Sequence, residues 1–227
     1  MKYFSDKTFK FLNNLQKNNN REWFNEHKAD YETHVRQRFQ ALISDFQAPL
    51  AKISSHYVAD PRAVGGSLFR INRDARFSKD KSPYKHFMGA RFYHEKGRDS
   101  EAPKFYFHLQ KNECFIAAGA WYPEADTLRK VRQFILDNPT SWKKAVYSKK
   151  FTDKYSREAD STVRVPRGFP DDHEFIADLK LKSFVAITPI SDEIVCSDQL
   201  LKSLVKSCQE MAPMMDYLCA ALDLEFL

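Results

Sequence analysis

The sequence predicts an α+β fold, in which an antiparallel sheet of about four to five strands is flanked by N-terminal and C-terminal helices. Apolar residues recur every three to four positions before residue 52 and after residue 125, which is the period of an amphipathic helix. Between residues 67 and 121 apolar and polar residues alternate in short runs that polar turns separate, as in β-strands. We expect these three parts, 1–52, 67–121 and 125–227, to form a single domain.

Two helices are expected in the N-terminal part. Ser5 is placed to cap the first helix, and the asparagines at 18–20 interrupt it. Asn20 is placed to cap a second, long helix that ends or kinks near Pro49. One apolar stripe runs along this second helix, made of Phe24, Tyr31, Val35, Phe39, Leu42, Phe46 and Leu50.

The middle part is expected to supply the sheet. Strands are predicted at residues 67–73, 86–94, 104–110 and 113–121. In the third strand Phe105 and Phe107 point to one face, while Tyr106 and His108 point to the other. A short polar turn at residues 110–113 predicts an antiparallel hairpin between the third and fourth strands.

The C-terminal part is expected to be mainly helical. Helical periods occur around Leu128–Ile135, around Trp142–Val146 and after Ser197, with a break at Pro213. Residues 184–187 read as one short buried strand.

Positive charge is concentrated in one stretch. From Arg70 to Lys85 six cations accompany two anions, a net charge of +4 in a chain of net charge +6. Phe69, Ile71 and Phe77 lie within or beside this stretch, so its charge sits on folded structure, and a bound anion would stabilise it. Guanidinium forks match phosphate or carboxylate oxygens, and lysines add mobile charges. The predicted ligand-binding residues are Arg70, Asn72, Arg73, Arg76, Lys79, Lys81, Ser82, Tyr84, Lys85 and Arg167.

Two histidines, His86 and His108, are candidate catalytic proton carriers because imidazole titrates near neutral pH. The alternative for each is a strand histidine that hydrogen-bonds a neighbour. His27, Asp30 and His34 lie at helical spacing, but no fourth ligand is apparent, so no metal site is predicted. The common phosphate-binding glycine motifs are absent, and the sequence names no cofactor.

Three functions remain open at this stage. The cations can hold an anionic small molecule, in an enzyme or a binding protein, or they can follow a nucleic-acid backbone while Tyr84 or Trp121 stacks on bases. They can also belong to a structural or partner-binding module, with Asp74 and Asp80 as their counter-charges. The oligomeric state does not follow from the sequence.

A cytoplasmic location is expected. No run of 18 apolar residues is present to span a membrane, and the first residues lack the apolar region of a secretory signal. The four cysteines form no C-x-x-C pair, which predicts reduced core residues.

Several blocks of the sequence resemble a widespread bacterial family of uncharacterised proteins, catalogued as domain of unknown function 2461. The resemblance is carried by Asn18–Phe24 (NNNREWF), Phe69–Asp74, Phe77–Lys85 (FSKDKSPYK), Gly119–Pro123, Pro166–Phe169 and Leu181–Val185 (LKSFV). It spans nearly the whole chain and implies one globular domain of cytosolic bacterial type. It implies no reaction and no catalytic residues.

Overall fold

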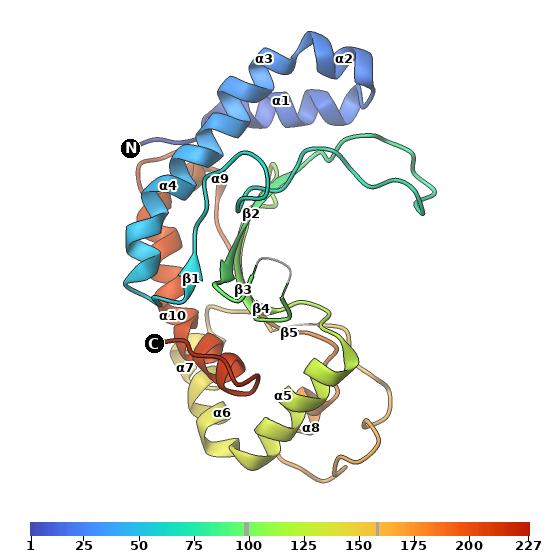
Figure 1. Ribbon diagram of the computed structural model, residues 1–227, viewed down its shortest axis with the longest axis vertical. Coiled ribbons are helices and arrows are strands. Elements are labelled where there is room, and N and C mark those ends of the chain that lie inside the picture. Colours follow the sequence, from blue (N-terminus) through green and yellow to red (C-terminus); the bar gives the residue numbers. More distant parts are fainter. Residues whose placement is uncertain (98–99, 158) are drawn as a thin grey trace.

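The computed structural model describes residues 1–97, 100–157 and 159–227. Within these residues five strands form one antiparallel sheet, in which neighbours follow in chain order (Figure 1). The strands are β1 (Tyr57–Val58), β2 (Met88–His94), β3 (Lys104–Leu109), β4 (Phe115–Ala120) and β5 (Phe184–Pro189). The predicted α+β class and the β3–β4 hairpin are confirmed.

Alternation along the strands gives the sheet one core face. Phe107 of β3 pairs with Ala90 and Ile116, and Phe92 and Phe105 share its face. Helices α4 (Gln37–Ala51) and α10 (Leu200–Ala220) cover this face. Phe92, Phe105 and Phe107 are completely buried there, and each such ring contributes about 1.5–3 kcal/mol of burial free energy.

Helix α10 passes through Pro213 without interruption, so the expected break is wrong. A proline inside a helix costs about 3 kcal/mol because it removes one hydrogen bond and crowds the preceding turn. Met214, Met215 and Leu218 follow it and are completely buried. Their burial outweighs the local cost and keeps the helix continuous.

The N-terminal part begins with α1 (Asp6–Lys17). The expected long helix is divided into α2 (Arg21–Glu26), α3 (Lys28–Tyr31), the π-helical segment η1 (Glu32–Arg36) and α4. Asn20 caps α2 as predicted, since its side chain accepts a hydrogen bond from the Trp23 amide at 2.9 Å. His27 ends α2, and its ring stacks on Trp23 with the centroids 4.1 Å apart.

Residues 121–183, here called the lobe, connect β4 to β5. Its helices are α5 (Ala125–Asp137), α6 (Pro139–Val146), α7 (Lys149–Thr152) and α8 (Ile176–Leu179). Asp178 lies at its centre, with one carboxylate oxygen 2.7 Å from Arg157. Trp142 and Tyr147 donate to the other oxygen at 3.1 and 2.6 Å. A short helix, α9 (Asp192–Val195), joins β5 to α10.

The first expected strand, residues 67–73, is wrong. Only two isolated bridges are formed in this region of the described chain, Leu68 with Ala90 and Asn72 with Tyr84. The segment is instead one side of a projecting, irregular hairpin, residues 68–87, which we call the arm (Figure 1).

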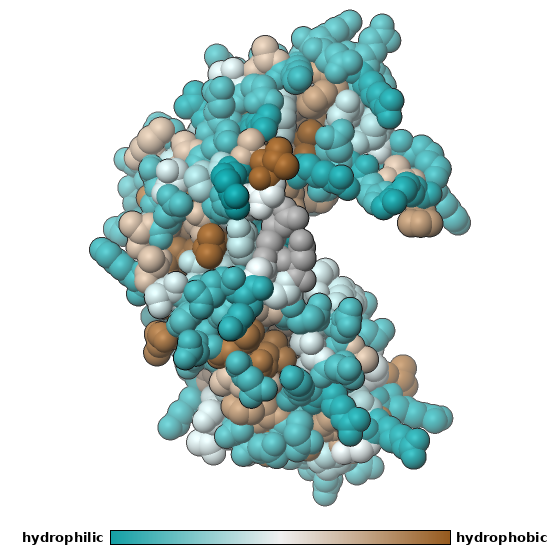
Figure 2. Space-filling model, in the orientation of Figure 1, coloured by the Kyte–Doolittle hydropathy of each residue, from teal (hydrophilic) through white to brown (hydrophobic). Residues whose placement is uncertain are grey.

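The molecule is C-shaped, and Figure 2 shows a deep notch in its surface. The arm forms one side of the notch and the lobe forms the other. Helices α4 and α10 lie on the outer side, so the opposite face of the sheet turns toward the notch. None of the helices in the described part of the chain has the length and apolarity to cross a membrane.

Candidate functional site

The base of the arm is held by backbone pairing and by two buried side chains. The Arg73 amide donates to the Pro83 carbonyl at 2.8 Å, and the Lys85 amide donates to the Ile71 carbonyl at 2.9 Å. Ile71 and Tyr84 are buried and join the main core. The base is therefore continuous with the body of the protein.

A side chain of the N-terminal part completes this base. The Asn19 amide nitrogen donates to the Tyr84 carbonyl at 2.9 Å, and the Asn19 oxygen accepts from the Tyr84 amide at 3.0 Å. Asn19 thus occupies the place of a neighbouring strand. The Tyr84 ring stacks on Phe24 at 4.2 Å. Two blocks that are far apart in the sequence, NNNREWF and FSKDKSPYK, therefore meet here.

We expect Asn19→Ala to lower the free energy of unfolding by about 1–2 kcal/mol, because two backbone groups of Tyr84 lose their partner. Hydrogen exchange at the Tyr84 amide would become faster than in the parent protein. The matched control is Asn18→Ala, which removes only an exposed bond to Asn14. Equal exchange at Tyr84 in the parent and in Asn19→Ala would contradict this role.

The arm tip, residues 74–82, is cross-linked by its own side chains. Arg76 holds Asp74 through two hydrogen bonds, of 3.0 and 2.7 Å, and Arg73 forms an ion pair with Asp80. Asp80 also accepts from the Ser82 amide and hydroxyl at 2.9 and 2.5 Å. The Lys81 ammonium donates to the carbonyls of residues 75 and 76 at 3.1 and 3.3 Å.

These contacts keep the two carboxylates of the tip ionised. Hydrogen bonds from Arg76 lower the pKa of Asp74 to about 2. Those from Ser82 and then Arg73 lower the pKa of Asp80 to about 2. Both groups are exposed, so each pair adds little to stability. Their effect is to favour one arrangement of the loop, which the lowered pKa values keep available at mildly acidic as well as neutral pH.

Five rings form a cluster on the sheet face that turns toward the notch. We call this cluster the ring platform; its members are Phe69, Phe87, Tyr106, His108 and Phe115. His108 lies between Phe87 and Phe115, with centroid distances of 4.7 and 4.5 Å. The Tyr106 ring lies against Gly89 of the neighbouring strand β2. A Cβ atom added at Gly89 would lie only 2.3 Å from the Tyr106 hydroxyl oxygen.

Both ring nitrogens of His108 have neighbours. Nδ1 lies 3.0 Å from the Tyr106 hydroxyl, and Nε2 lies 3.4 Å from the Gln110 side-chain oxygen. Burial lowers the pKa of His108, and this effect outweighs the hydrogen bond to Gln110 and the charge of Glu113, which act in the opposite direction. The imidazole is therefore neutral at pH 7. Its contacts agree with the alternative of a hydrogen-bonded strand histidine, and catalysis by His108 or His86 stays a prediction.

Two cations lie over the Phe69 ring of the platform. The Lys85 ammonium is 5.2 Å from the ring centroid, and the Arg91 guanidinium is 5.3 Å from it. Burial lowers the pKa of Lys85, and the charge of Arg70 lowers it further. Lys85 donates to the Arg70 carbonyl at 3.0 Å, and no carboxylate of the described residues pairs with it. The Lys85 ammonium therefore has no carboxylate counter-ion among the described residues.

Comparison with known families decides what the chain is related to. The family model described as conserved hypothetical protein (DUF2461) matches residues 7–217. The chain belongs to the DUF2461 family. A comparison with curated proteins finds no match.

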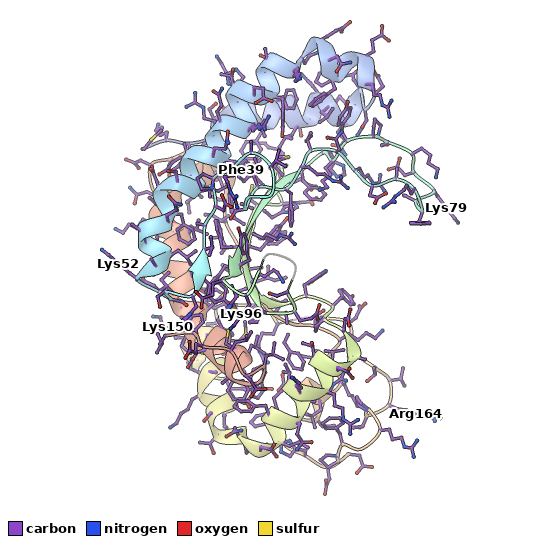
Figure 3. The ribbon with its side chains drawn as sticks, in the orientation of Figure 1. Phe39, Lys52, Lys79, Lys96, Lys150 and Arg164 are labelled. Carbon is purple, nitrogen blue, oxygen red and sulfur yellow. The ribbon has the colours of Figure 1, made fainter. Side chains whose placement is uncertain are left out.

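In this DUF2461 protein the arm brings together nine of the ten predicted ligand-binding residues, which it holds in one hairpin. Their side chains differ in surroundings, since Tyr84 is buried while Arg70 and Lys79 are exposed. Arg167 is separate from them. It lies in the lobe, three residues after Arg164, which Figure 3 places across the notch from Lys79.

The sequence does not predict several residues of this site in the DUF2461 chain: the platform rings Phe69, Phe87, Tyr106 and Phe115, the cation Arg91 and the arm-holding Asn19. Arg91 had a usable signal, because a charged residue interrupts an otherwise apolar strand. Phe115 pairs directly with His108 across the β3–β4 hairpin. That pairing follows from the turn, and it identifies Phe115 as a neighbour of the predicted histidine.

Proposed function

We propose that the protein binds a phosphate- or carboxylate-bearing small molecule at the base of the arm, beside the ring platform. The observation that carries the proposal is the half-buried Lys85 ammonium, which lies next to Arg70 and has no carboxylate partner in the described structure. A desolvated cation beside a like charge is unfavourable, and a bound anion relieves both costs.

The platform indicates what the rest of the ligand is. Phe69 carries two cations over its ring, and Tyr106 lies 5.7 Å from it, centroid to centroid. Flat rings stack well on such a surface, and the adjacent cations suit a phosphate. A nucleotide combines both chemical features. If a reaction follows binding, His108 and His86 are the predicted proton carriers.

The test is binding of nucleoside phosphates, sugar phosphates and dicarboxylates, measured by thermal shift and then by calorimetry. A ligand of the native state raises the melting temperature. Losing a charge-assisted hydrogen bond of about 1.5–3 kcal/mol weakens binding by roughly ten- to a hundredfold. We expect this weakening for both Arg70→Ala and Lys85→Ala.

Lys52→Ala is the matched control, because Lys52 lies on the outer side of the molecule (Figure 3). Arg70→Ala is expected to leave the fold intact, because the Arg70 side chain is exposed and the backbone carbonyl of residue 70 can still accept the hydrogen bond from Lys85. Weaker binding by this variant therefore reports on the site and not on unfolding. Unchanged affinity in both arm variants would refute the proposed site.

A further inference from the structure

The arm tip presents two side chains in a fixed loop. Phe77 is 95% exposed, and Lys79 lies at the end of the arm (Figure 3). A single exposed apolar residue is ordinary on a protein surface. Here, however, the loop around it is cross-linked by Arg73 with Asp80 and by Arg76 with Asp74. These pairs favour the loop arrangement in which Phe77 is exposed, which reduces the ordering cost of binding.

The surroundings of Phe77 are cationic. Figure 2 shows a small hydrophobic spot among hydrophilic side chains at the end of the arm. The Arg76 guanidinium lies 5.8 Å from the centroid of the Phe77 ring. Residues 70–85 carry a net charge of +4, so the arm as a whole, and less so its tip, is complementary to a polyanion.

The tip and the ring platform belong to one surface. The tip is part of the arm, and the platform adjoins the arm through Phe69 and Phe87. The platform turns toward the notch that the arm borders. Across the notch the lobe carries Arg164 (Figure 3). Trp121, the first residue of the lobe after β4, is 66% exposed. Rings and cations therefore occur on both the arm and the lobe.

From this arrangement we propose that the notch holds a single-stranded nucleic acid. Its bases stack on Phe77 and on the platform, and its phosphates contact Lys79, Arg70 and Lys85. Single strands expose the flat faces of their bases, whereas duplexes bury them, so exposed aromatic rings select the single-stranded form. This inference rests on the proposed function, because it uses the same anion site and adds the arm tip to it.

The experiment is fluorescence anisotropy with a labelled oligonucleotide of about 15 thymidines or uridines, a range that suits such grooves. The parent is expected to bind the single strand better than a duplex of equal length, with affinity that falls as salt rises from about 50 to 200 mM. Phe77→Ala is expected to weaken binding by about five- to a hundredfold, the effect of losing one stacked base. Phe77→Trp retains binding.

Two further variants make the test specific. Phe77→Leu keeps an apolar side chain but removes the ring, so it is expected to bind as weakly as Phe77→Ala. Lys79→Ala is expected to weaken binding and to reduce the slope of the logarithm of affinity against the logarithm of salt concentration by about one. Lys52→Ala, on the outer side of the molecule, is expected to bind as the parent does.

Three outcomes overturn the inference. Full binding by Phe77→Ala removes the tip from the site. Full binding by Phe77→Leu, or Phe77-dependent binding to anionic phospholipid vesicles without oligonucleotide binding, assigns the tip to an apolar or membrane surface. Binding of a mononucleotide that Arg70→Ala weakens, with no gain from a longer strand, leaves the proposed function standing and ends this extension. If neither ligand binds, both proposals fail.

Discussion

Replacing Asp178 by alanine is expected to lower the free energy of unfolding by about 3–5 kcal/mol, the usual effect of removing one partner from a buried ion pair. The Asp178 side chain is 3% exposed and that of Arg157 is 17% exposed. The substitution leaves the guanidinium buried without its counter-charge. It also removes the acceptor of the Trp142 indole and the Tyr147 hydroxyl.

Urea unfolding, followed by tryptophan fluorescence, measures this effect. The matched control is Asp153→Ala in the same lobe, which breaks the pair of Lys149 and Asp153, whose side chains are 88% and 60% exposed. An exposed pair of this kind is worth about 0.5 kcal/mol or less. Similar losses in Asp178→Ala and Asp153→Ala would show that the buried network does not hold the lobe together.

The second large effect is expected at Gly119 in β4. Its φ angle is +133°, and a Cβ atom there would lie 2.0 Å from the Phe184 carbonyl oxygen and 2.8 Å from the Val185 Cα. Backbone atoms of a paired strand cannot move away without breaking the β4–β5 ladder. We expect Gly119→Ala to cost about 3 kcal/mol or more, from backbone strain and overpacking together.

Gly168→Ala separates these two causes. Gly168 also has a positive φ, +91°, but no atom lies within 4 Å of the Cβ position. It is expected to cost only the conformational part, about 1–2 kcal/mol. The measurement for both variants is the urea midpoint, with the fold checked by circular dichroism. A loss at Gly119 no larger than that at Gly168 would contradict the steric argument.

The sequence predicts the sheet well wherever a strand has a packed partner. Phe105 and Phe107 alternate with Tyr106 and His108 because one face of β3 is buried. Residues 67–73 show a similar alternation but form no regular strand. Leu68 pairs with Ala90, whereas Asn72 pairs with Tyr84, so the segment changes partner along its length. Pro83 next to Tyr84 has no amide hydrogen to donate, and the backbone of Tyr84 is paired with the Asn19 side chain from a distant part of the chain. Local patterns do not contain that contact.

The charge of the arm was visible in the sequence, and Asp74 and Asp80 were candidate counter-charges, but the cation that each carboxylate contacts was not visible. Asp74 and Arg76 are two residues apart, and Arg73 and Asp80 are seven apart. Neither spacing predicts a contact unless the loop geometry is known. The structure shows these pairs closed, so the cations without a carboxylate partner in the described arm are Arg70, Lys79, Lys81 and Lys85. The ring platform could not be predicted without the register in which β2, β3 and β4 pair.

The way in which the lobe is joined to the sheet has a consequence for divergence among homologous chains. Ala120 and Phe184, the residues at its two ends, are direct neighbours in the β4–β5 ladder. The intervening chain leaves and re-enters at adjacent points, as a hairpin loop does. Insertions, deletions or replacement of this segment need not change the order or the pairing of the strands. The wall of the notch that the lobe forms can therefore change in length without altering the order of the strands.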